Sequence, residues 1–420
     1  MSPLFFSHPS LFLIVIRSFF TLLVLCSPLP TLITYPDLDF FSLSLVCLTL
    51  WLRLFIYIAN FFGRNRVILV FSFGALVILL ALSFYSSSLL GFYFFFEASL
   101  IPIFWIILTW GYQPERLAAR LIIFFYTLAS SFPLLAVILM LRIESFSLVM
   151  LSIFNSSPSV RSWIRLAAML AFLVKFPVYC AHIWLPKAHV EAPVSGSIIL
   201  AGVLLKLGGY GLFRISFFWV ERSPAAVWAA IAMMGGGLLG VLCVRATDMK
   251  ILIAYSSVVH MALIILNLLI LENRGFRGAW WIILAHGLVS SGIFAIANLL
   301  YERAHSRRIL INKGAIRTNP SFSIFWFLII IINFGGPFTL NLLGEIYLII
   351  RAASISAFML VPVAFLSFFS AAYRLILFTS TQQGLPSSSN LPILGVTGRE
   401  LTLMFGHVWP VMALLGALGI

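Results

Sequence analysis

The sequence predicts an all-α, polytopic membrane protein with about 13 transmembrane helices, and two observations carry this prediction. Hydrophobic residues make up 62% of the 420 residues and charged residues only 9%, whereas a soluble domain is about one quarter charged. Apolar runs of about 20 residues, the length that crosses a bilayer as a helix, recur along the whole chain. The polar segments between them are short, so no extramembrane domain is expected.

Charge and turn signals bound the predicted helices in order along the chain. The first run carries Arg17 inside it and has no small-residue cleavage site, so we expect it to stay as an anchor instead of being removed as a signal peptide. Later runs stop at polar segments such as 36–39 and 63–66, and the longest polar loop is 302–320. The expected spans are 11–27, 40–62, 67–86, 88–110, 117–141, 163–185, 193–217, 225–245, 250–271, 277–300, 322–350, 355–379 and 400–419.

The net charge of +14 has a topological explanation. In a soluble protein such an excess would suggest a nucleic-acid partner, but here the basic residues gather in short loops, as the positive-inside rule predicts. No nucleic acid is therefore expected. The loops 63–66, 245–250 and 302–317 are predicted to face the matrix or cytoplasm. The basic loop 303–317 is also a candidate contact for anionic lipid.

Several other chemistries are excluded or disfavoured. The four cysteines form no CxxC pair and support neither a disulfide framework nor a metal or iron–sulfur site. The string GGGLLG at 235–240 has the spacing of a dinucleotide motif, but it lies in an apolar helix without a preceding strand. It is interpreted as a helix-packing surface. Haem ligation by paired histidines is disfavoured, because lysines and acids accompany them. The cysteines are Cys26, Cys47, Cys180 and Cys243.

Two predicted helices contain breaks with an ionisable residue nearby. One contains the sequence Lys-Phe-Pro at 175–177, and the other contains Gly-Gly-Pro at 335–337 followed by Glu345. Proline removes a helical hydrogen bond, and glycine adds backbone freedom beside it. Interrupted helices in corresponding halves of a transporter indicate an ion site built on inverted repeats.

Four charged side chains within apolar segments are candidates for moving charge across the membrane. Lys175 and Lys206 each cost about 3 kcal/mol at the bilayer centre. Glu97 lies among aromatic residues, so we expect its carboxyl group to be protonated or paired with Lys175. The alternative is a purely structural ion pair between helices. Glu345 is the second intramembrane acid, for which Arg351 is an alternative structural counter-charge.

Histidines in the apolar helices extend this set of candidates. His260 and His286 lie in separate predicted spans. A lone buried histidine is usually a hydrogen-bonded core group, but two near other titratable groups are candidates for a proton relay. For His182, a relay and a structural role both stay open. No role is assigned to the others, which are expected near termini, in loops or at the interface: His8, His189, His305 and His407.

Long ordered motifs carry a resemblance to one family. They are FEASLIP at 96–102, WGYQPERLAA at 110–119, the whole stretch 175–211, RATDMKILIAYSSVVHM at 245–261, HGLVSSGIF at 286–294 and GGPFTLNLLGE at 335–345. These segments resemble the chain 4 family of NADH:ubiquinone oxidoreductase, the antiporter-like, proton-pumping membrane subunits of respiratory complex I. The match is close over 88–350 and looser in the flanks. The resemblance is to the mitochondrially encoded members of the family, which implies a location in the mitochondrial inner membrane.

The resemblance implies an architecture and a relay. Two inverted five-helix repeats, each with a broken helix, would occupy 88–217 and 225–380, with N-terminal helices at 1–87 and a C-terminal loop and helix at 381–420. No cofactor is expected on this chain: FMN, iron–sulfur clusters and ubiquinone would be held by partner subunits of the complex, and the chain's own partners would be the other membrane-arm subunits. The implied relay residues are Glu97, Lys175, Lys206, His260, His286 and Glu345.

The chain departs from this family in three places. The family usually has fourteen helices, and the N-terminal region here is one short. Cys180 stands where glycine is usual, and Arg120 where small residues are common. The function that the resemblance implies is proton translocation driven by distant redox chemistry, as part of an H⁺-translocating NADH:ubiquinone reductase. The alternatives are a stand-alone cation/proton antiporter and a scaffold subunit without its own channel.

Overall fold

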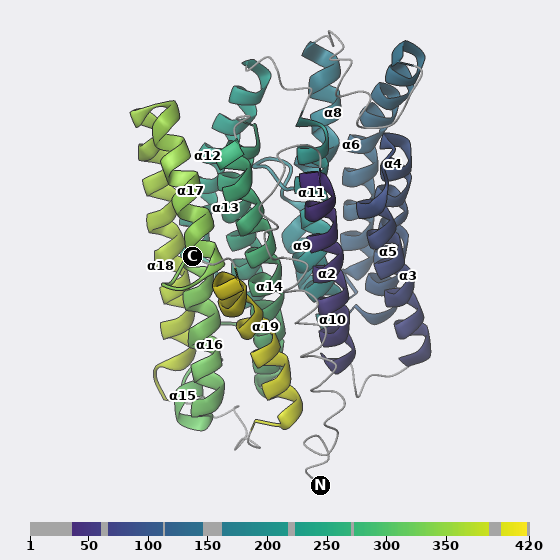
Figure 1. Ribbon diagram of the computed structural model, residues 1–420. Coiled ribbons are helices and arrows are strands. Elements are labelled where there is room, and N and C mark those ends of the chain that lie inside the picture. Colours follow the sequence, from purple (N-terminus) through teal and green to yellow (C-terminus); the bar gives the residue numbers. More distant parts are fainter. Residues whose placement is uncertain are drawn as a thin grey trace.

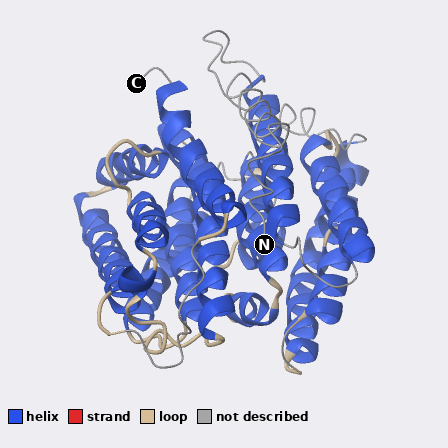
Figure 2. Cartoon of the chain, turned by 90° about the horizontal axis from the view of Figure 1, so that it is seen from below, coloured by secondary structure: helices blue, strands red, loops and turns tan. Residues whose placement is uncertain are grey.

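The chain folds into a bundle of roughly parallel helices (Figure 1). The computed structural model describes residues 36–59, 66–111, 114–145, 162–216, 223–269, 273–385 and 396–417. Within these ranges the secondary structure is helical, with one isolated bridge and no strand, as Figure 2 also shows. The all-α prediction is therefore confirmed. The expected first span, 11–27, lies outside the described residues.

Nine helices in the described part are long and apolar enough to cross a bilayer. Others are shorter because their spans are interrupted, so the total of about 13 stays a prediction. The helices are α2 (Pro36–Ala59), α3 (Arg66–Tyr85), α4 (Leu89–Ala98), α5 (Leu100–Trp110), α6 (Arg116–Ser145), α8 (Ser162–Lys175), α9 (Trp184–Glu191), α10 (Val194–Ile199), the π-helix η1 (Leu200–Leu204), α11 (Leu205–Arg214), α12 (Ser223–Val244), α13 (Met249–Leu269), α14 (Asn273–Ala304), α15 (Ala315–Thr318), α16 (Pro320–Asn333), α17 (Leu340–Ile355), the 3₁₀-helix η3 (Ala357–Met359), α18 (Leu360–Gln382) and α19 (Gly398–Ala417).

Helix α14 is the axis of the bundle. It packs against α2, α10, η1, α13, α16, α17 and α19. All residues of the 18-residue apolar stretch by which α14 could cross the membrane are buried inside the protein. In the corresponding apolar stretches of α6 and α18, only 33% and 28% of the residues are buried. A helix that is apolar all round and buried belongs to the interior of a membrane bundle, whereas α6 and α18 present apolar side chains at its periphery.

The first break lies between α8 and α9, where Pro177 interrupts the helical hydrogen bonds. Pro177 has no N–H for the carbonyl of Leu173, and the N–H of Val178 donates to that carbonyl instead, at 3.1 Å. The carbonyl of Val174 is released in this way, and the indole N–H of Trp184 donates to it at 2.9 Å. A side chain of the next half-helix thus replaces the missing backbone donor, as buried carbonyls require.

The second break, between α16 and α17, uses the same device. Pro337 lies between the half-helices, and the N–H of Gly336 donates to the carbonyl of Ile331, one residue further back than in an α-helix, at 2.9 Å. The side-chain amide of Asn341 then donates to the carbonyl of Ile332 at 2.9 Å. The predicted pair of broken helices is confirmed, although 322–350 was predicted as a single span and contains two separate helices.

Left-handed backbone accompanies both breaks. Cys180 has a φ of 78° in the first, while Gly335 and Phe338 have φ values of 78° and 61° in the second. Glycine adopts this region without the steric cost that a Cβ atom brings. Cys180 is therefore in a strained backbone conformation that glycine would adopt without this cost.

One other expectation from the sequence is confirmed and one is supported in part: the matrix or cytoplasmic orientation of the basic loops stays a prediction, and residues 63–65 lie outside the described residues. The basic loops 245–250 and 302–317 lie on one side of the bundle, because Asp248 and Arg308 form a β-bridge and the N–H of Met249 donates to the carbonyl of Arg307 at 3.0 Å. The glycine-rich string 235–240 is a packing surface: α12 lies so close to α18 that a Cβ atom on Gly240 would be 2.9 Å from that of Phe369.

Candidate functional site

Lys206 is held in the centre of the bundle by an irregular helix. Residues 200–204 form a π-helix, and the Lys206 ammonium group donates to the carbonyl of Ala201, which belongs to this turn. The Lys206 side chain has no exposed surface. Single π-helical turns inside α-helices often mark functional sites. Here the turn supplies a hydrogen-bond acceptor to a charge that would otherwise be costly to bury.

The second partner of Lys206 is a histidine on the central helix. The Nζ atom lies 2.9 Å from Nδ1 of His286, which is buried on α14. This distance suits an ammonium group that donates to Nδ1 of a neutral imidazole, and in that assignment Nε2 carries the ring proton. Two glycines let the helices approach, since a Cβ atom on Gly287 would lie 3.0 Å from the carbonyl oxygen of Gly202.

His260 continues the row onto α13. Its ring centroid lies 5.3 Å from that of His286, with an angle of 58° between the ring planes. The side chain is 3% exposed, and Nε2 has no hydrogen-bond partner among the described residues. Lys206, His286 and His260 thus bring three titratable side chains of three helices into one buried row. The sequence predicted these residues as candidates, and the structure brings them together.

Glu97 and Lys175 form a second group on α4 and α8. The Lys175 ammonium donates to the carbonyl of Phe96 at 2.8 Å and lies 3.1 Å from the centroid of the Phe96 ring. It interacts electrostatically with the Glu97 carboxyl group. Both Glu97 oxygens are buried and make no hydrogen bond of normal geometry among the described residues, although the Ser131 hydroxyl of α6 lies close enough to interact with the carboxyl group. The expected direct ion pair is therefore corrected: the two charges are neighbours, but the ammonium bonds to the residue beside the acid.

Glu345 lies on α17, against the second break and on the opposite side of the bundle from α4 and α8 (Figure 1). Its carboxylate packs on the backbone of Gly335, where an added Cβ atom would be 2.7 Å from Oε2. Glu345 also interacts electrostatically with Arg374 of α18. The proposed structural counter-charge Arg351 donates to the Ser354 hydroxyl at 2.8 Å. The acid is thus placed by the broken helix, as the sequence pattern predicted.

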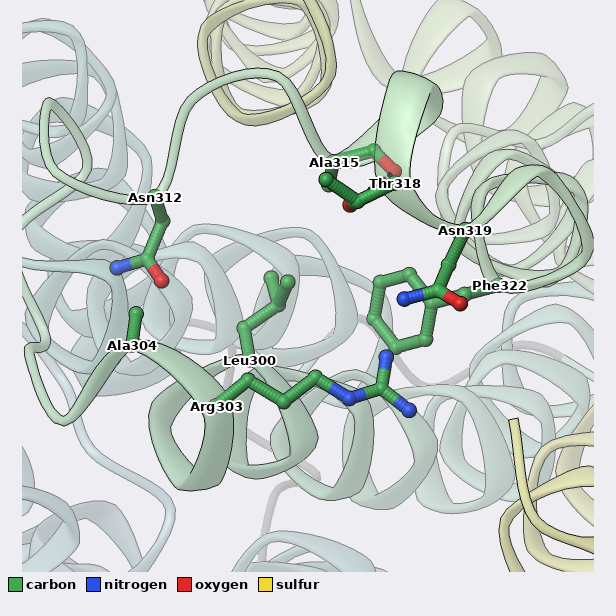
Figure 3. A pocket seen from close by; sticks show the side chains of 8 residues that line it. All are labelled: Leu300, Arg303, Ala304, Asn312, Ala315, Thr318, Asn319 and Phe322. Atoms are coloured by element: carbon green, nitrogen blue, oxygen red, sulfur yellow. Dashed lines mark hydrogen bonds between the residues drawn. The ribbon is translucent and has the colours of Figure 1, made fainter. Parts of the chain in front are cut away.

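A small surface pocket near the end of α14 is separate from these groups (Figure 3). Arg303 lines it, lies over the ring of Phe322 with 5.2 Å to the centroid, and forms a 2.9 Å ion pair with Glu400 of α19. Along α14, at 1.5 Å per residue, Arg303 is about 25 Å from His286. The described residues contain no group of three side chains that could hold a metal. The buried row of titratable groups is therefore the candidate site.

Comparison with known proteins decides the family. The transmembrane family described as NADH:quinone oxidoreductase/Mrp antiporter matches residues 86–370, about two thirds of the chain. The chain belongs to this family. NADH-ubiquinone oxidoreductase chain 4 of Ceratitis capitata is 43% identical over 387 residues, covering 90% of this chain and 86% of the relative. Chain 4 of Aedes aegypti is 45% identical over 325 residues, covering 77% and 73%.

Two solved structures share the fold of this family member. A chain of respiratory complex I from Thermus thermophilus with bound NADH has a TM-score of 0.77 and 25% identity, covering 90% of this chain and 80% of that one. A chain of the Mrp complex from Dietzia sp. has a TM-score of 0.76 at 16% identity, covering 90% and 79%. The second likeness concerns the fold alone.

The predicted positions of two of the remaining histidines were wrong. His189, expected at a loop or interface, is fully buried on α9 and stacks on Phe294 at 4.2 Å between ring centroids. His407, to which no role was given, is fully buried on α19 and bonds to the carbonyl of Leu403 at 2.8 Å. His189 lies between the expected spans 163–185 and 193–217, where no helix was predicted, whereas His407 lies inside the expected span 400–419 and only its burial was missed. His182 packs on tyrosine rings of α13 and the break, apart from the row at Lys206.

Sequence reasoning missed three buried cations among the described residues, namely Arg165, Lys250 and Arg374. Lys250 lies at the start of α13 and is 6% exposed, and its ammonium is 3.4 Å from the carbonyl oxygens of Val190 and Ala192. Arg374, on α18, is 2% exposed. A signal for Arg374 was present, since it is an arginine inside an apolar run, and such residues usually have a function.

Proposed function

We propose that this chain is a proton-translocating membrane-arm subunit of NADH:ubiquinone oxidoreductase in the mitochondrial inner membrane. The observation that carries the proposal is the 2.9 Å contact between Lys206 and His286 at the centre of the bundle. The family and the names of the chain 4 relatives support it. As part of that complex the chain belongs to an enzyme, and its partners are other subunits of the complex.

The relay starts at Glu97 and Lys175. The ammonium of Lys175 interacts with the acid without bonding to it, so a small conformational change alters the strength of that interaction. Redox energy released in partner subunits drives the change. The altered charge at Lys175 then acts on the proton held by Lys206. Charges in a low-dielectric interior influence one another over longer distances than in water.

Proton transfer through the centre follows the geometry of the row. The Lys206 ammonium gives a proton to Nδ1 of His286, across a normal hydrogen bond. The imidazole then holds protons on both ring nitrogens, and Nε2 releases one toward His260. From His260 the proton passes by way of water to the Glu345 carboxylate, beside the second break. Each step moves one proton. His286 is left with its proton on Nδ1, so the ring returns to the tautomer protonated on Nε2 before it accepts from Lys206 again.

We further propose that this chain supplies only proton carriers to the complex. FMN, iron–sulfur clusters and ubiquinone are then held by partner subunits. The basic loop 303–317 faces anionic lipid headgroups through its exposed arginines, Arg308 and Arg317. Arg303 serves a different purpose, because it pairs with Glu400.

A stand-alone cation/proton antiporter is the alternative that a specific observation favours, namely the shared fold with a chain of the Mrp complex. A scaffold without its own channel is the other, but it gives no reason to bury Lys206 against His286. The purification of the chain from mitochondrial membranes in mild detergent tests the proposal. We expect it to co-migrate with NADH-oxidising, ubiquinone-reducing activity. If the chain migrates as a small particle without this activity and shows sodium-dependent antiport, the proposal is contradicted.

A further inference from the structure

Helix α18 carries an arginine in the membrane interior to which the relay described above gives no part. Arg374 lies about 12 Å before the end of the helix at Gln382, and its side chain is 2% exposed. Tyr373 and Leu377 share its buried face, while Phe368 and Leu375 on the opposite face are well exposed. A guanidinium in this position does not reach the bilayer surface by extending along the helix, so it is charged inside the bundle.

The donors of Arg374 make no hydrogen bond of normal geometry among the described residues, although the adjacent Tyr373 hydroxyl lies close enough to interact with the guanidinium. Its Nε and both terminal nitrogens are buried. The carbon at the centre of the guanidinium lies 5.5 Å from the centroid of the Tyr373 ring. A purely structural arginine in a membrane protein is normally bonded to carbonyls or carboxylates, because unpaired buried donors are costly. Arg374 therefore needs another explanation.

The surroundings of Arg374 contain the second half of the proposed relay. Helix α18 packs against α12, α13 and α17. The titratable groups that interact with the guanidinium from these helices and from α14 and α18 are Cys243, His260, His286, Glu345 and Tyr373. Glu345 is the single carboxylic acid in this set. It lies next to the second break, but Arg374 and Glu345 form no ion pair within the part of the chain that the structure describes.

We propose that Arg374 is a positioning residue of the relay: a fixed positive charge that acts through Glu345 and holds this acid as the acceptor for protons arriving from His260. The guanidinium does not exchange its own proton, because it stays charged at every physiological pH. Its charge attracts the carboxylate and opposes the accumulation of positive charge on both imidazoles. This inference rests on the proposed function of the chain.

The test compares variants of the assembled complex in membrane vesicles, with proton uptake measured per NADH oxidised. Arg374→Gln removes the charge, and we expect at least about a twofold loss of proton yield. Arg374→Lys keeps a positive charge, and we expect it to restore most of the yield. Arg351→Gln is the matched control, because it removes an arginine of α17 that bonds to Ser354, and we expect a normal yield.

A double variant separates action through Glu345 from a general effect on packing. If Arg374 acts through the acid, Arg374→Gln causes no further loss in a Glu345→Gln background. Additive losses would overturn the inference. So would a normal yield in Arg374→Gln, or a lysine variant as impaired as the glutamine variant.

Assembly gives a second readout in case Arg374→Gln fails to accumulate. Removing one of two buried opposite charges leaves the other uncompensated. We then expect Glu345→Gln together with Arg374→Gln to restore assembly, and a double variant that still fails to assemble would overturn the inference. The proposed function is tested separately: if Lys206→Met abolishes pumping while Arg374→Gln pumps normally, only the inference about Arg374 is wrong.

Discussion

The Nζ atom of Lys206 lies 2.9 Å from Nδ1 of His286, at the centre of the bundle. Two features of the fold produce this contact. The π-helix at 200–204 supplies the carbonyl of Ala201 as a second acceptor, and the glycines at 202 and 287 let the helices approach. A lysine and a histidine that share a hydrogen bond in a buried site exchange a proton without a large movement of either side chain.

His286→Gln tests whether the ring must carry a proton. The glutamine oxygen keeps an acceptor for the Lys206 ammonium, but an amide does not take up and release protons. We expect the complex to assemble and proton uptake per NADH to fall by at least about twofold. His407→Gln is the matched control, since it removes a buried histidine that bonds to Leu403. Equal proton yields from the two variants would contradict a role for His286.

Gly335→Ala tests the support that the second break gives to Glu345. An alanine at a φ of 78° costs about 1–2 kcal/mol, and its Cβ atom would be 2.7 Å from the carboxylate. We expect a lower temperature of thermal inactivation and weaker pumping. Gly74→Ala in α3 is the control, because no atom lies within 4 Å of its added Cβ. A Gly335→Ala complex as stable and active as the Gly74→Ala complex would refute this account of the break.

Cys180→Gly is expected to stabilise the first break. Cys180 holds a φ of 78°, where a Cβ atom is strained and glycine is not. The gain should be about 1 kcal/mol or less, because glycine also adds freedom to the unfolded chain. The measurement is the temperature at which the detergent-solubilised complex loses activity. Cys180→Ala keeps the strain and should behave like the original chain. A glycine variant that is less stable than the alanine variant would contradict the interpretation that Cys180 is strained.

Glu97 and Lys175 should depend on each other for assembly but not substitute for each other in pumping. Lys175→Met leaves the buried acid uncompensated, so we expect less assembled complex on a native gel. Adding Glu97→Gln should restore assembly while proton uptake stays low. If the double variant assembles and pumps normally, the chain is a scaffold at this end of the bundle.

The sequence was sufficient to predict the broken helices and the candidate charges. Pro177 and Pro337 remove helical hydrogen bonds wherever they stand in a span, and a lysine inside an apolar run such as Lys206 is recognisable without knowing which helices surround it. These are local properties of the chain. The residues that close the breaks, Trp184 and Asn341, could not be predicted, because their partners are set by the direction of the second half-helix.

Contacts between distant segments could not be predicted from the sequence. The pairing of Lys206 with His286 depends on two glycines that bring η1 against α14, and apolar periodicity does not specify which helices meet. For the same reason the bond from Lys175 to the carbonyl of Phe96 was not foreseen. The burial of His407 follows from the packing of α19 on α14, and that helix pair also could not be derived from the sequence.

Lys206→Met in the assembled complex tests the central claim most directly. The variant keeps the volume and apolar stem of the side chain but carries no proton. Lys187→Met, at an exposed position on α9, is the control. The account predicts continued NADH oxidation by ubiquinone with proton uptake per NADH well below that of the control. Proton uptake equal to that of Lys187→Met, with the same rate of NADH oxidation, would contradict it.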